Sequence, residues 1–470
     1  MRKEKIMDEQ SILSKATKLL TTYGVEYSEM RIEYTDLLEI HISDSTSPKV
    51  DINHDHGGCI RIKHKGSWSF VSFTDFSQID RYFDIAYLQA IHTEQTSDSL
   101  IDDARVSVVK DNADHRQFID PRQINLNDKI HLLSCYYQLI LKQGGYISAA
   151  NVNYFEKITR ILFLNSEGSH IDQTKYDVSA SFVMHVKNGE TRDTLCMDVG
   201  SMQGFDTVLG LDDQLIDFCS LAQNVITAGK VEAGVYPVIF DPALASLFIH
   251  ESIGHLCEAD EFGNNPDFLS EIPLGTRLAS EKLNVYDTGE FFFTRGGLEY
   301  DDEGVLCQRS DLISKGSLVG LLHNRHSAAV HNSMPSGNAR AVNYRFPPIV
   351  RMRCICIEPG SDVFNDMIQE IDYGIYALGA GTGRVYRGSF QFSSRYAFII
   401  RNGKVCEQAK GITFSGNIFD FLSKIDKIGA IPHSYDGPGG CSKGDQFALP
   451  TGGYCPHIRV QNVRIEENDE

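Results

Sequence analysis

The chain has 470 residues, of which 42% are hydrophobic, 10% aromatic and 23% charged, a composition typical of a folded protein. Its 63 acidic residues outnumber its 44 lysines and arginines, and the net charge of -19 repels phosphate backbones and anionic membrane surfaces at long range. Neither a nucleic acid nor a membrane is therefore expected as a partner.

The sequence also indicates a cellular location. Residues 1–10 are charged and contain no apolar stretch of the kind found in signal peptides. No run approaches the roughly 18 apolar residues that a membrane-spanning helix needs. Eleven cysteines, spread from Cys59 to Cys455, fit a reducing compartment better than a disulfide framework. We therefore expect a cytoplasmic protein.

The first half of the chain alternates between helical and β patterns. Apolar residues at helical spacing predict helices over residues 11–23, 79–94, 128–142 and 206–227. Short β-rich runs between turn residues predict strands, the first four as an antiparallel meander, over residues 26–34, 37–43, 58–65, 68–74, 146–155, 158–165 and 176–186. This half is predicted to have an α+β fold.

A chain of this length exceeds what one hydrophobic core usually organises, so two domains are expected. The stretch Ala228-Gly229-Lys230 is the best candidate boundary. We therefore predict an N-terminal α+β domain over residues 1–229 and a C-terminal β-rich domain over residues 230–470.

Strand patterns dominate the second half. They cover residues 236–240, 316–323, 348–358, 395–401 and 457–464, and they predict a barrel-like antiparallel domain. One helix stands out near its start. Asp241-Pro242 supplies an N-cap carboxylate followed by proline at the first helical position, and residues 243–261 continue with a helical pattern.

This helix carries the sequence His250-Glu251-Ser252-Ile253-Gly254-His255, in which two imidazoles flank a carboxylate, the residue set of a hydrolytic zinc site. The imidazoles are five residues apart, which overshoots one helical turn by about 140°. A π-type bulge or a local break, which Gly254 would permit, would bring both onto one face. The alternative is a surface helix with two unrelated histidines.

A zinc site of this kind needs a third protein ligand. The candidates are Cys257 and Glu258 just downstream, or Cys441, Cys455 or His457 brought in by the fold. Cys441 lies on a glycine-dense loop, where the backbone can approach a metal closely, although a cysteine there is often structural.

Three further residues are candidates for substrate binding. Asp301 and Asp302 belong to a run of four carboxylates within residues 299–303, which would hold a second cation, line the path of a basic peptide, or form a solvated acidic loop. Arg340 has the fork geometry that receives a carboxylate. The glycine-rich residues 379–384 lack the spacing of a dinucleotide fingerprint and favour an edge or turn beside a cleft.

Taken in order, several segments resemble the TldD/PmbA family, and in particular its TldD branch. They are HESIGHLCEAD at residues 250–260, EYDDEG at 299–304, SGNARAVNY at 336–344, GGCSKGDQ at 439–446 and, in the first half, GGCIRIKHKGSWSFVS at 57–72. The resemblance extends over nearly the whole chain.

The resemblance implies a cytosolic zinc metalloprotease that hydrolyses unfolded peptides or trims precursor peptides, with an α+β N-terminal and a β-rich C-terminal domain. Carried over by position, His250 and His255 match the two histidine ligands, Cys441 the cysteine ligand, and Glu251 the catalytic glutamate. Zn²⁺ would activate a water molecule, and Glu251 would accept its proton. A PmbA-type (TldE) paralogue without the metal motif is the implied partner, and composition leaves a homodimer equally open.

Two segments depart from the family pattern. The sequence after Cys441 reads Ser-Lys-Gly-Asp-Gln in place of Gly-Lys-x-Gly-Gln, and residues 336–340 lack one glycine. Both changes would reshape a substrate groove. They leave open a zinc amidohydrolase or deacetylase acting on a small biosynthetic intermediate. A non-catalytic subunit of a heteromeric protease is the other alternative, and the intact set of metal-site residues argues against it.

Overall fold

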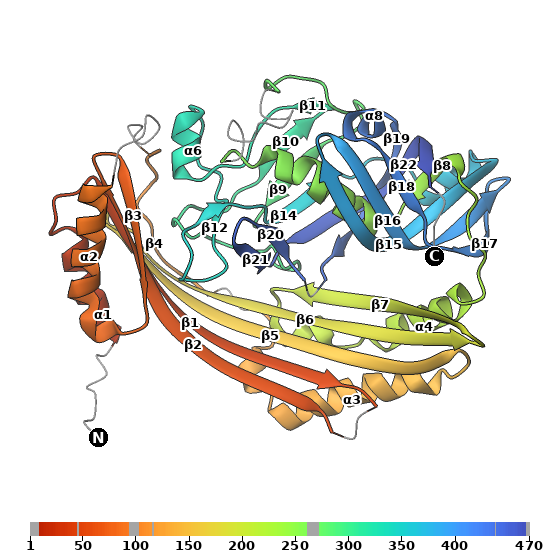
Figure 1. Ribbon diagram of the computed structural model, residues 1–470, viewed down its shortest axis with the longest axis horizontal. Coiled ribbons are helices and arrows are strands. Elements are labelled where there is room, and N and C mark those ends of the chain that lie inside the picture. Colours follow the sequence, from red (N-terminus) through yellow and green to blue (C-terminus); the bar gives the residue numbers. More distant parts are fainter. Residues whose placement is uncertain are drawn as a thin grey trace.

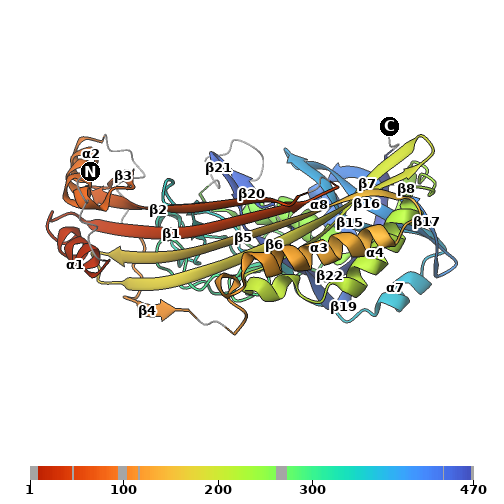
Figure 2. The same ribbon diagram turned by 90° about the horizontal axis from the view of Figure 1, so that it is seen from below.

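The computed structural model of the chain describes residues 9–44, 47–93, 103–114, 117–260, 272–437 and 439–466. Figure 1 shows a long curved sheet formed by the first half of the chain, with a β-rich body formed by the second half on its concave side. Helices α3 and α4 run along the convex side of the sheet, as Figure 2 shows from below. The α+β class with a β-rich second half, predicted from the sequence, is confirmed.

The curved sheet has seven strands in the order β3-β2-β1-β5-β6-β4, with β7 paired to β6. All neighbours are antiparallel except β4 and β6. The strands are β1 (Tyr27–Ile42), β2 (Lys49–His64), β3 (Ser67–Phe73), β4 (Lys110–Ala113), β5 (Ile147–Asn165), β6 (His170–Asn188) and β7 (Thr191–Ser201). β1 and β5 are each a single strand where the sequence predicted two. The polar residues Thr35-Asp36 and Glu156-Lys157, which separated the predicted strands, are paired within the ladder between β1 and β5.

Four helices accompany this sheet, close to the predicted positions. They are α1 (Glu9–Leu20), α2 (Ile79–His92), α3 (Leu126–Lys142) and α4 (Asp212–Val225). The single helix predicted over residues 206–227 is wrong, because Gly210 adopts a positive φ of 67° between the 3₁₀ turn Gly204–Val208 and α4. Residue 94, the predicted end of the second helix, lies outside the described residues.

The second half of the chain forms an eleven-stranded sheet, part of which closes into a ring. The order β22-β18-β16-β15-β8 is completed by a further pairing of β8 with β22, so these five strands surround a core. The barrel-like form is confirmed, with mostly antiparallel pairs and parallel ones at β8–β15 and β14–β22. The strands of this sheet are β8 (Gly234–Phe240), β9 (Val285–Thr288), β10 (Ser310–Ser314), β11 (Ser317–Leu318), β14 (Cys354–Ile357), β15 (Tyr373–Tyr386), β16 (Ser389–Arg401), β17 (Lys404–Lys410), β18 (Thr413–Asn417), β19 (Ile425–Tyr435) and β22 (Gly452–Ile465).

Smaller elements complete this half. Two separate ladders pair β12 (Ala339–Arg340) with β13 (Ile349–Val350), and β20 (Cys441–Lys443) with β21 (Gln446–Leu449). The helices are α5 (Pro242–Ile249), α6 (Arg325–Val330), α7 (Phe364–Gln369) and α8 (Ile418–Ser423). Within the described part of the chain, none of the helices combines the length and the apolar character needed to cross a bilayer.

Some predictions for this half need correction. The strand predicted over residues 316–323 is reduced to β11, since the chain continues into irregular structure whose Leu322 pairs with Glu258. Residues 379–384 lie within β15 beyond its pairing with β8, so they form a glycine-rich edge, one of the two predicted options.

Helix α5 is anchored in the barrel by an aromatic cluster. The Phe248 ring lies 4.5 Å from that of Phe421 and 5.2 Å from those of Phe390 and Phe392, centroid to centroid, and Phe240 completes the group. Phe248 is fully buried. The helix is therefore fixed against the core immediately before its two histidines.

Ion pairs join the two halves of the chain, and they range from fully buried (Arg31–Asp302) to exposed (Asp55–Arg345). In each pair, the first residue belongs to the curved sheet and the second to the other half of the chain. The pairs are Arg31–Asp302, Arg61–Glu303, Asp177–Arg295, Asp55–Arg345 and Asp198–Arg395. The main hydrophobic clusters are separate, one in the barrel and two on the curved sheet. We propose that the domain division falls at the predicted place, between residues 1–229 and 230–470.

The aromatic anchor yields a stability prediction. Phe248→Ala should lower the free energy of unfolding by about 3–5 kcal/mol, because it leaves a cavity among four other rings. The measurement is urea-induced unfolding followed by circular dichroism. Phe447→Ala, which removes a ring that is 68% exposed, is the control and should change this free energy by about 0.5 kcal/mol or less. Equal effects of the two substitutions would contradict the assigned packing.

Candidate metal centre

Asp241 fixes the start of the helix that carries the two histidines. Its side chain accepts hydrogen bonds from the backbone N–H of Leu244 (2.8 Å) and of Gly379 in β15 (2.9 Å). Pro242 occupies the first helical position. The predicted start signal is confirmed, and it ties the helix to the strand beside it.

The helix changes its period at the candidate site. Residues His250–Gly254 form a π-helical turn, in which the N–H of His255 donates to the carbonyl oxygen of His250, and a 3₁₀ turn follows over His255–Cys257. This i to i+5 bond places the two histidines above one another, with ring centroids 5.1 Å apart. The π-type turn predicted from the spacing is confirmed.

Close packing at Gly254 accompanies this turn. A Cβ atom at this position would lie 1.9 Å from the sulfur of Met352. The helix ends at Cys257 rather than at the predicted residue 261, because the backbone turns extended at Glu258 and pairs with Leu322. Residue 261 itself lies outside the described residues.

Cys441 joins the two histidines from the other end of the chain. The donor atoms of His250, His255 and Cys441 all lie within 4.8 Å of one another, and Cys441 Sγ is 3.2 Å from His255 Nε2. Ligand atoms around a tetrahedral zinc ion are roughly 3.3–3.6 Å apart. Two imidazoles and a thiol at this spacing therefore fit zinc, and the described residues contain no other such group.

The surroundings of Cys441 favour the form that binds metals. Burial alone would raise the pKa of its thiol, but the hydrogen bonds with His250 and His255, together with the charges of these two residues, outweigh burial and lower the pKa to about 5. The thiolate therefore predominates at neutral pH, and thiolate is the form of cysteine that coordinates metal ions.

Glu258 and Lys443 connect the segments that carry the candidate ligands. The buried Glu258 carboxylate lies 3.1 Å from His255 Nδ1, so Nε2 of this ring is the nitrogen that faces Cys441. Lys443, two residues after Cys441, is 3.2 Å from the same carboxylate oxygen and 2.6 Å from Asp260. A carboxylate behind a ligating imidazole fixes the orientation of its ring.

The other candidates for a third ligand lie outside this group. Cys257 and Cys455 are fully buried in the barrel core, where burial raises the pKa of both thiols. Nε2 of His457 is 2.9 Å from the Tyr376 hydroxyl. Glu258 contacts His255 from behind, as an outer partner.

A cavity of about 570 Å³ opens at the three donors. Glu251 lines it, and among the described residues its carboxylate has no hydrogen-bond or ion-pair partner. Asp198, Arg395 and Tyr435 contribute polar groups to the wall. Five glycines form much of the remaining wall, namely Gly437, Gly439, Gly440, Gly452 and Gly453.

Asp301, Asp302 and Arg340 lie elsewhere, and none of them lines this cavity. Asp301 is 1% exposed and accepts three backbone N–H groups, while Asp302 accepts the N–H of Ala341 and lies 3.5 Å from Arg31. The interpretation of these residues as a solvated acidic loop is therefore wrong, because their carboxylates are buried and accept hydrogen bonds from buried donors. Arg340 donates to the carbonyl oxygens of Met352 and Pro450. A role of these three residues in substrate binding stays a prediction.

Sequence reasoning missed the outer residues of the site. Asp198 comes from β7 and Arg395 from β16, where Arg395 donates to Asp198 and to the carbonyl oxygens of Ala380 and Cys196. Nothing in the local sequence marks this pairing, since its members are 197 residues apart. For Lys443 the sequence offered only a weak indication, namely its position two residues after the candidate ligand Cys441.

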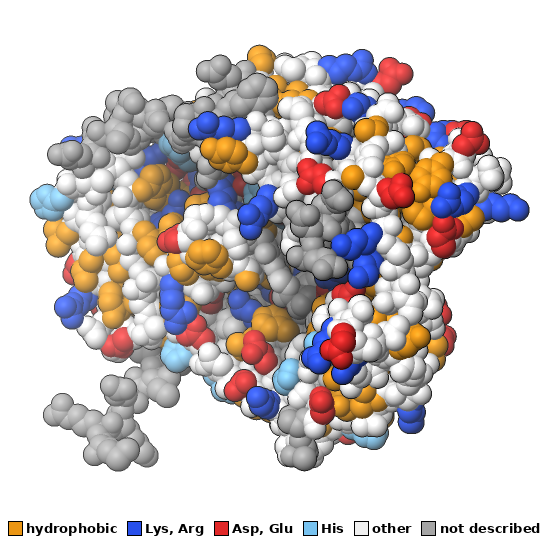
Figure 3. Space-filling model, turned by 45° about the vertical axis from the view of Figure 1, so that its right-hand side comes forward, with side chains coloured by type: hydrophobic (Ala, Val, Ile, Leu, Met, Phe, Trp, Pro, Cys, Tyr) orange, Lys and Arg blue, Asp and Glu red, His pale blue; other side chains and the backbone are white. Residues whose placement is uncertain are grey.

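On the face drawn in Figure 3, acidic and basic side chains are interspersed with hydrophobic ones. The surplus of acidic residues found in the sequence is therefore not gathered into a single patch on this face.

Comparisons with known proteins identify the relatives of this chain. Residues 233–467 match a family model described as the PmbA/TldA metallopeptidase C-terminal domain. A curated metalloprotease of Synechocystis is 33% identical, over 95% of this chain and 98% of that protein. A zinc metalloprotease TldD homolog of Saccharolobus solfataricus is 26% identical, over 94% and 97% of the two chains.

Solved structures share the fold at low sequence identity. A putative modulator of a DNA gyrase from Thermotoga maritima superposes with a TM-score of 0.81 at 14% identity, over 97% of this chain and all of that one. TldE from Thermococcus kodakarensis gives a TM-score of 0.76 at 15% identity, over 97% and 99% of the two chains.

The contact behind His255 can be tested through metal affinity. Glu258→Gln keeps the shape of the side chain but removes its charge, and we expect the affinity for Zn²⁺ to fall by about tenfold. Competition with a chromophoric chelator measures the affinity. Glu358→Gln removes a surface carboxylate that pairs with Arg309, and this control should leave the affinity unchanged. An unchanged affinity in Glu258→Gln would contradict the orienting role.

Proposed function

The chain belongs to the PmbA/TldD metallopeptidase family, and from this premise we propose that it is a zinc-dependent peptidase that hydrolyses unfolded peptides or trims precursor peptides. The observation that carries the proposal is the convergence of His250, His255 and Cys441 beside Glu251 in one open cavity.

Zn²⁺ would be held by Nε2 of His255, by the imidazole of His250 and by the thiolate of Cys441. When bound by three protein ligands, zinc supplies Lewis-acid activation of water and of the scissile carbonyl group. One thiolate makes this ligand set less positive than three imidazoles, so proton removal relies more strongly on a neighbouring base.

Glu251 would be that base. It follows His250 directly in the π-helical turn and lines the same cavity, with a carboxylate that no described residue engages. It would accept the proton of the attacking water and return it to the leaving nitrogen of the cleaved amide.

The shape of the cavity favours an extended peptide. No atom lies within 4 Å of a Cβ built on Gly439, and a Cβ on Gly437 would meet its nearest atoms at 3.9 Å, so a main chain can approach this wall closely. A peptide that adds as a strand beside such a wall is bound through its backbone, with little dependence on sequence.

The proposal includes a partner subunit. The likeness in fold to TldE supports a partner of the PmbA/TldE type, and a second copy of this chain is the alternative. Size measurement of the purified chain, alone and mixed with such a paralogue, distinguishes the two.

Glu251→Gln tests the base. This variant should keep about one zinc ion per chain and lose peptide cleavage by roughly 10²–10⁴-fold, because the proton acceptor is gone while the ligands remain. Elemental analysis and a mixed-peptide cleavage assay give the two values. A variant that cleaves as fast as the wild type would remove Glu251 from the mechanism. Cleavage of small N-acyl amides but not of peptides would favour an amidohydrolase.

Cys441→Ala tests the third ligand. We expect it to lose both zinc and cleavage, because only two imidazoles would remain. Cys135→Ala and Cys406→Ala, which change exposed cysteines, are matched controls and should behave like the wild type. Zinc retained in Cys441→Ala, or a wild type without zinc, would contradict the assignment. An inactive wild type that carries zinc would point to a missing partner subunit.

A further inference from the structure

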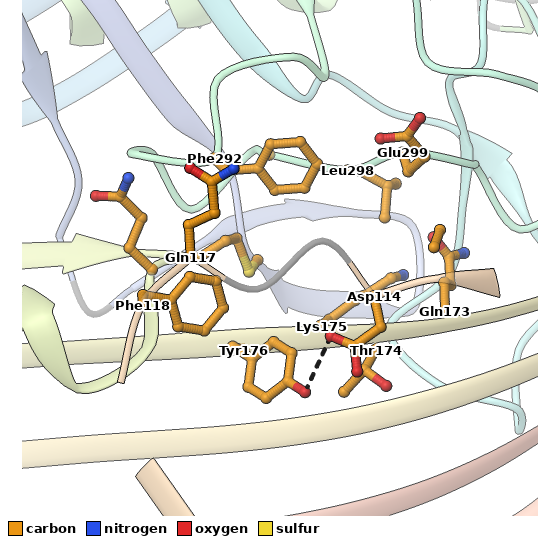
Figure 4. A pocket seen from close by; sticks show the side chains of 14 residues that line it. Asp114, Gln117, Phe118, Gln173, Thr174, Lys175, Tyr176, Phe292, Leu298 and Glu299 are labelled. Carbon is orange, nitrogen blue, oxygen red and sulfur yellow. Dashed lines mark hydrogen bonds between the residues drawn. The ribbon is translucent and has the colours of Figure 1, made fainter. Parts of the chain in front are cut away.

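A second cavity, of about 250 Å³, lies beside β6, between the end of its pairing with β4 at Gln173 and the start of its pairing with β7 at Val178. Figure 4 shows Lys175 and Tyr176 of β6 below it, with Phe292 and Leu298 of the second half on its opposite side. Tyr176 lines this second cavity, and Asp198 lines the cavity at the candidate metal centre. The two residues lie on the paired strands β6 and β7, several positions apart in the register.

Arg295 contacts the two strands between the residues that line the two cavities. It contacts β6 at Asp177 and β7 at Gly200, both of which lie between the positions that line the cavities. A Cβ atom at Gly200 would lie only 2.6 Å from Cδ of Arg295. The Arg295 side chain can therefore pack against β7 at this position only because residue 200 is a glycine. Arg295 is 2% exposed.

The guanidinium group of Arg295 binds two parts of the chain at once. Its Nε and Nη2 donate to the two carboxylate oxygens of Asp177, at 2.6 and 2.8 Å. Its Nη1 donates to the carbonyl oxygens of Gly437 and Gly439, and its backbone N–H donates to Asp436 at 2.7 Å. These last three contacts fix the segment that leads into Cys441.

We infer that Arg295 is a positioning residue, which uses Asp177 of the curved sheet to hold Asp436, Gly437 and Gly439 so that the thiolate of Cys441 faces the two histidines. This inference rests on the proposed function, because it assumes that Cys441 is a metal ligand. It makes the metal affinity of the C-terminal half depend on a carboxylate of the N-terminal half.

Glycine-rich segments need such a restraint. Gly437 and Gly439 have no side chains to pack, and no atom lies within 4 Å of a Cβ built on Gly439. The planar guanidinium group holds several N–H donors in fixed directions, so it can bind the carbonyl oxygens of Gly437 and Gly439 and the carboxylate of Asp177 together. A lysine ammonium group lacks this geometry. The loss of an outer contact of this kind weakens metal binding by about 10- to 100-fold.

Arg295→Lys is the first test, in the full-length chain. We expect Zn²⁺ to bind about 10- to 100-fold more weakly in a chelator competition. With Co²⁺ as the probe, the thiolate-to-cobalt charge-transfer absorption should weaken, because Cys441 is displaced. Arg459→Lys is a matched control, since Arg459 is a buried arginine that pairs through two nitrogens with Asp426 and donates to the carbonyl oxygen of Met367, away from residues 436–441.

The outcomes separate this inference from the proposed function. Weak binding in Arg295→Lys with wild-type binding in Arg459→Lys supports it, while equal affinities in the two variants overturn it. If Arg295→Lys does not fold, Asp177→Asn replaces it, and wild-type affinity and absorption there overturn the inference. A Cys441→Ala variant with wild-type affinity would overturn both proposals, whereas loss in Cys441→Ala without loss in Arg295→Lys overturns the positioning role alone.

Discussion

Two imidazoles five residues apart can face one metal ion only if their helix gives up its regular period, and the candidate site depends on this constraint. The π-helical turn at His250–Gly254 meets it. Its position is fixed from the N-terminal side, by the N-cap of Asp241 at the start of α5 and by the aromatic packing of Phe248. Gly254 then allows the turn to lie against Met352. Core packing thus determines where the irregular turn falls.

The candidate ligands all come from the second half of the chain, but the site is walled and braced by both halves. Asp198 and Asp177 of the curved sheet hold Arg395 and Arg295, which reach the cavity wall and the segment before Cys441. Loss of either partner would leave a buried charge without its counterion, which is strongly destabilising, so each carboxylate holds its arginine in place. The relative position of the two halves is therefore part of the site.

Local signals allowed much of this arrangement to be predicted from the sequence. Asp241-Pro242 marked the start of the helix, and the five-residue spacing of the histidines predicted a π-type bulge or a local break, of which the structure has the π-helical turn. Long-range pairing could not be read in the same way. The acidic residues Asp301 and Asp302 gave the pattern of an exposed loop, yet they are buried because donors distant in sequence satisfy them. Arg295 gave no signal, since its partners lie 118 and 144 residues away.

The fold alone does not decide the chemistry. The two solved structures named above are only 14–15% identical to the chain, and a shared scaffold at that distance is compatible with many activities. The chemistry of the site therefore depends on a few side chains and their contacts. A thiolate stabilised by two imidazoles, an imidazole oriented by a buried carboxylate, and a glutamate left without a partner among the described residues together make up the parts that metal-assisted hydrolysis requires. The barrel and the curved sheet supply the rigidity that keeps these parts within reach of one another.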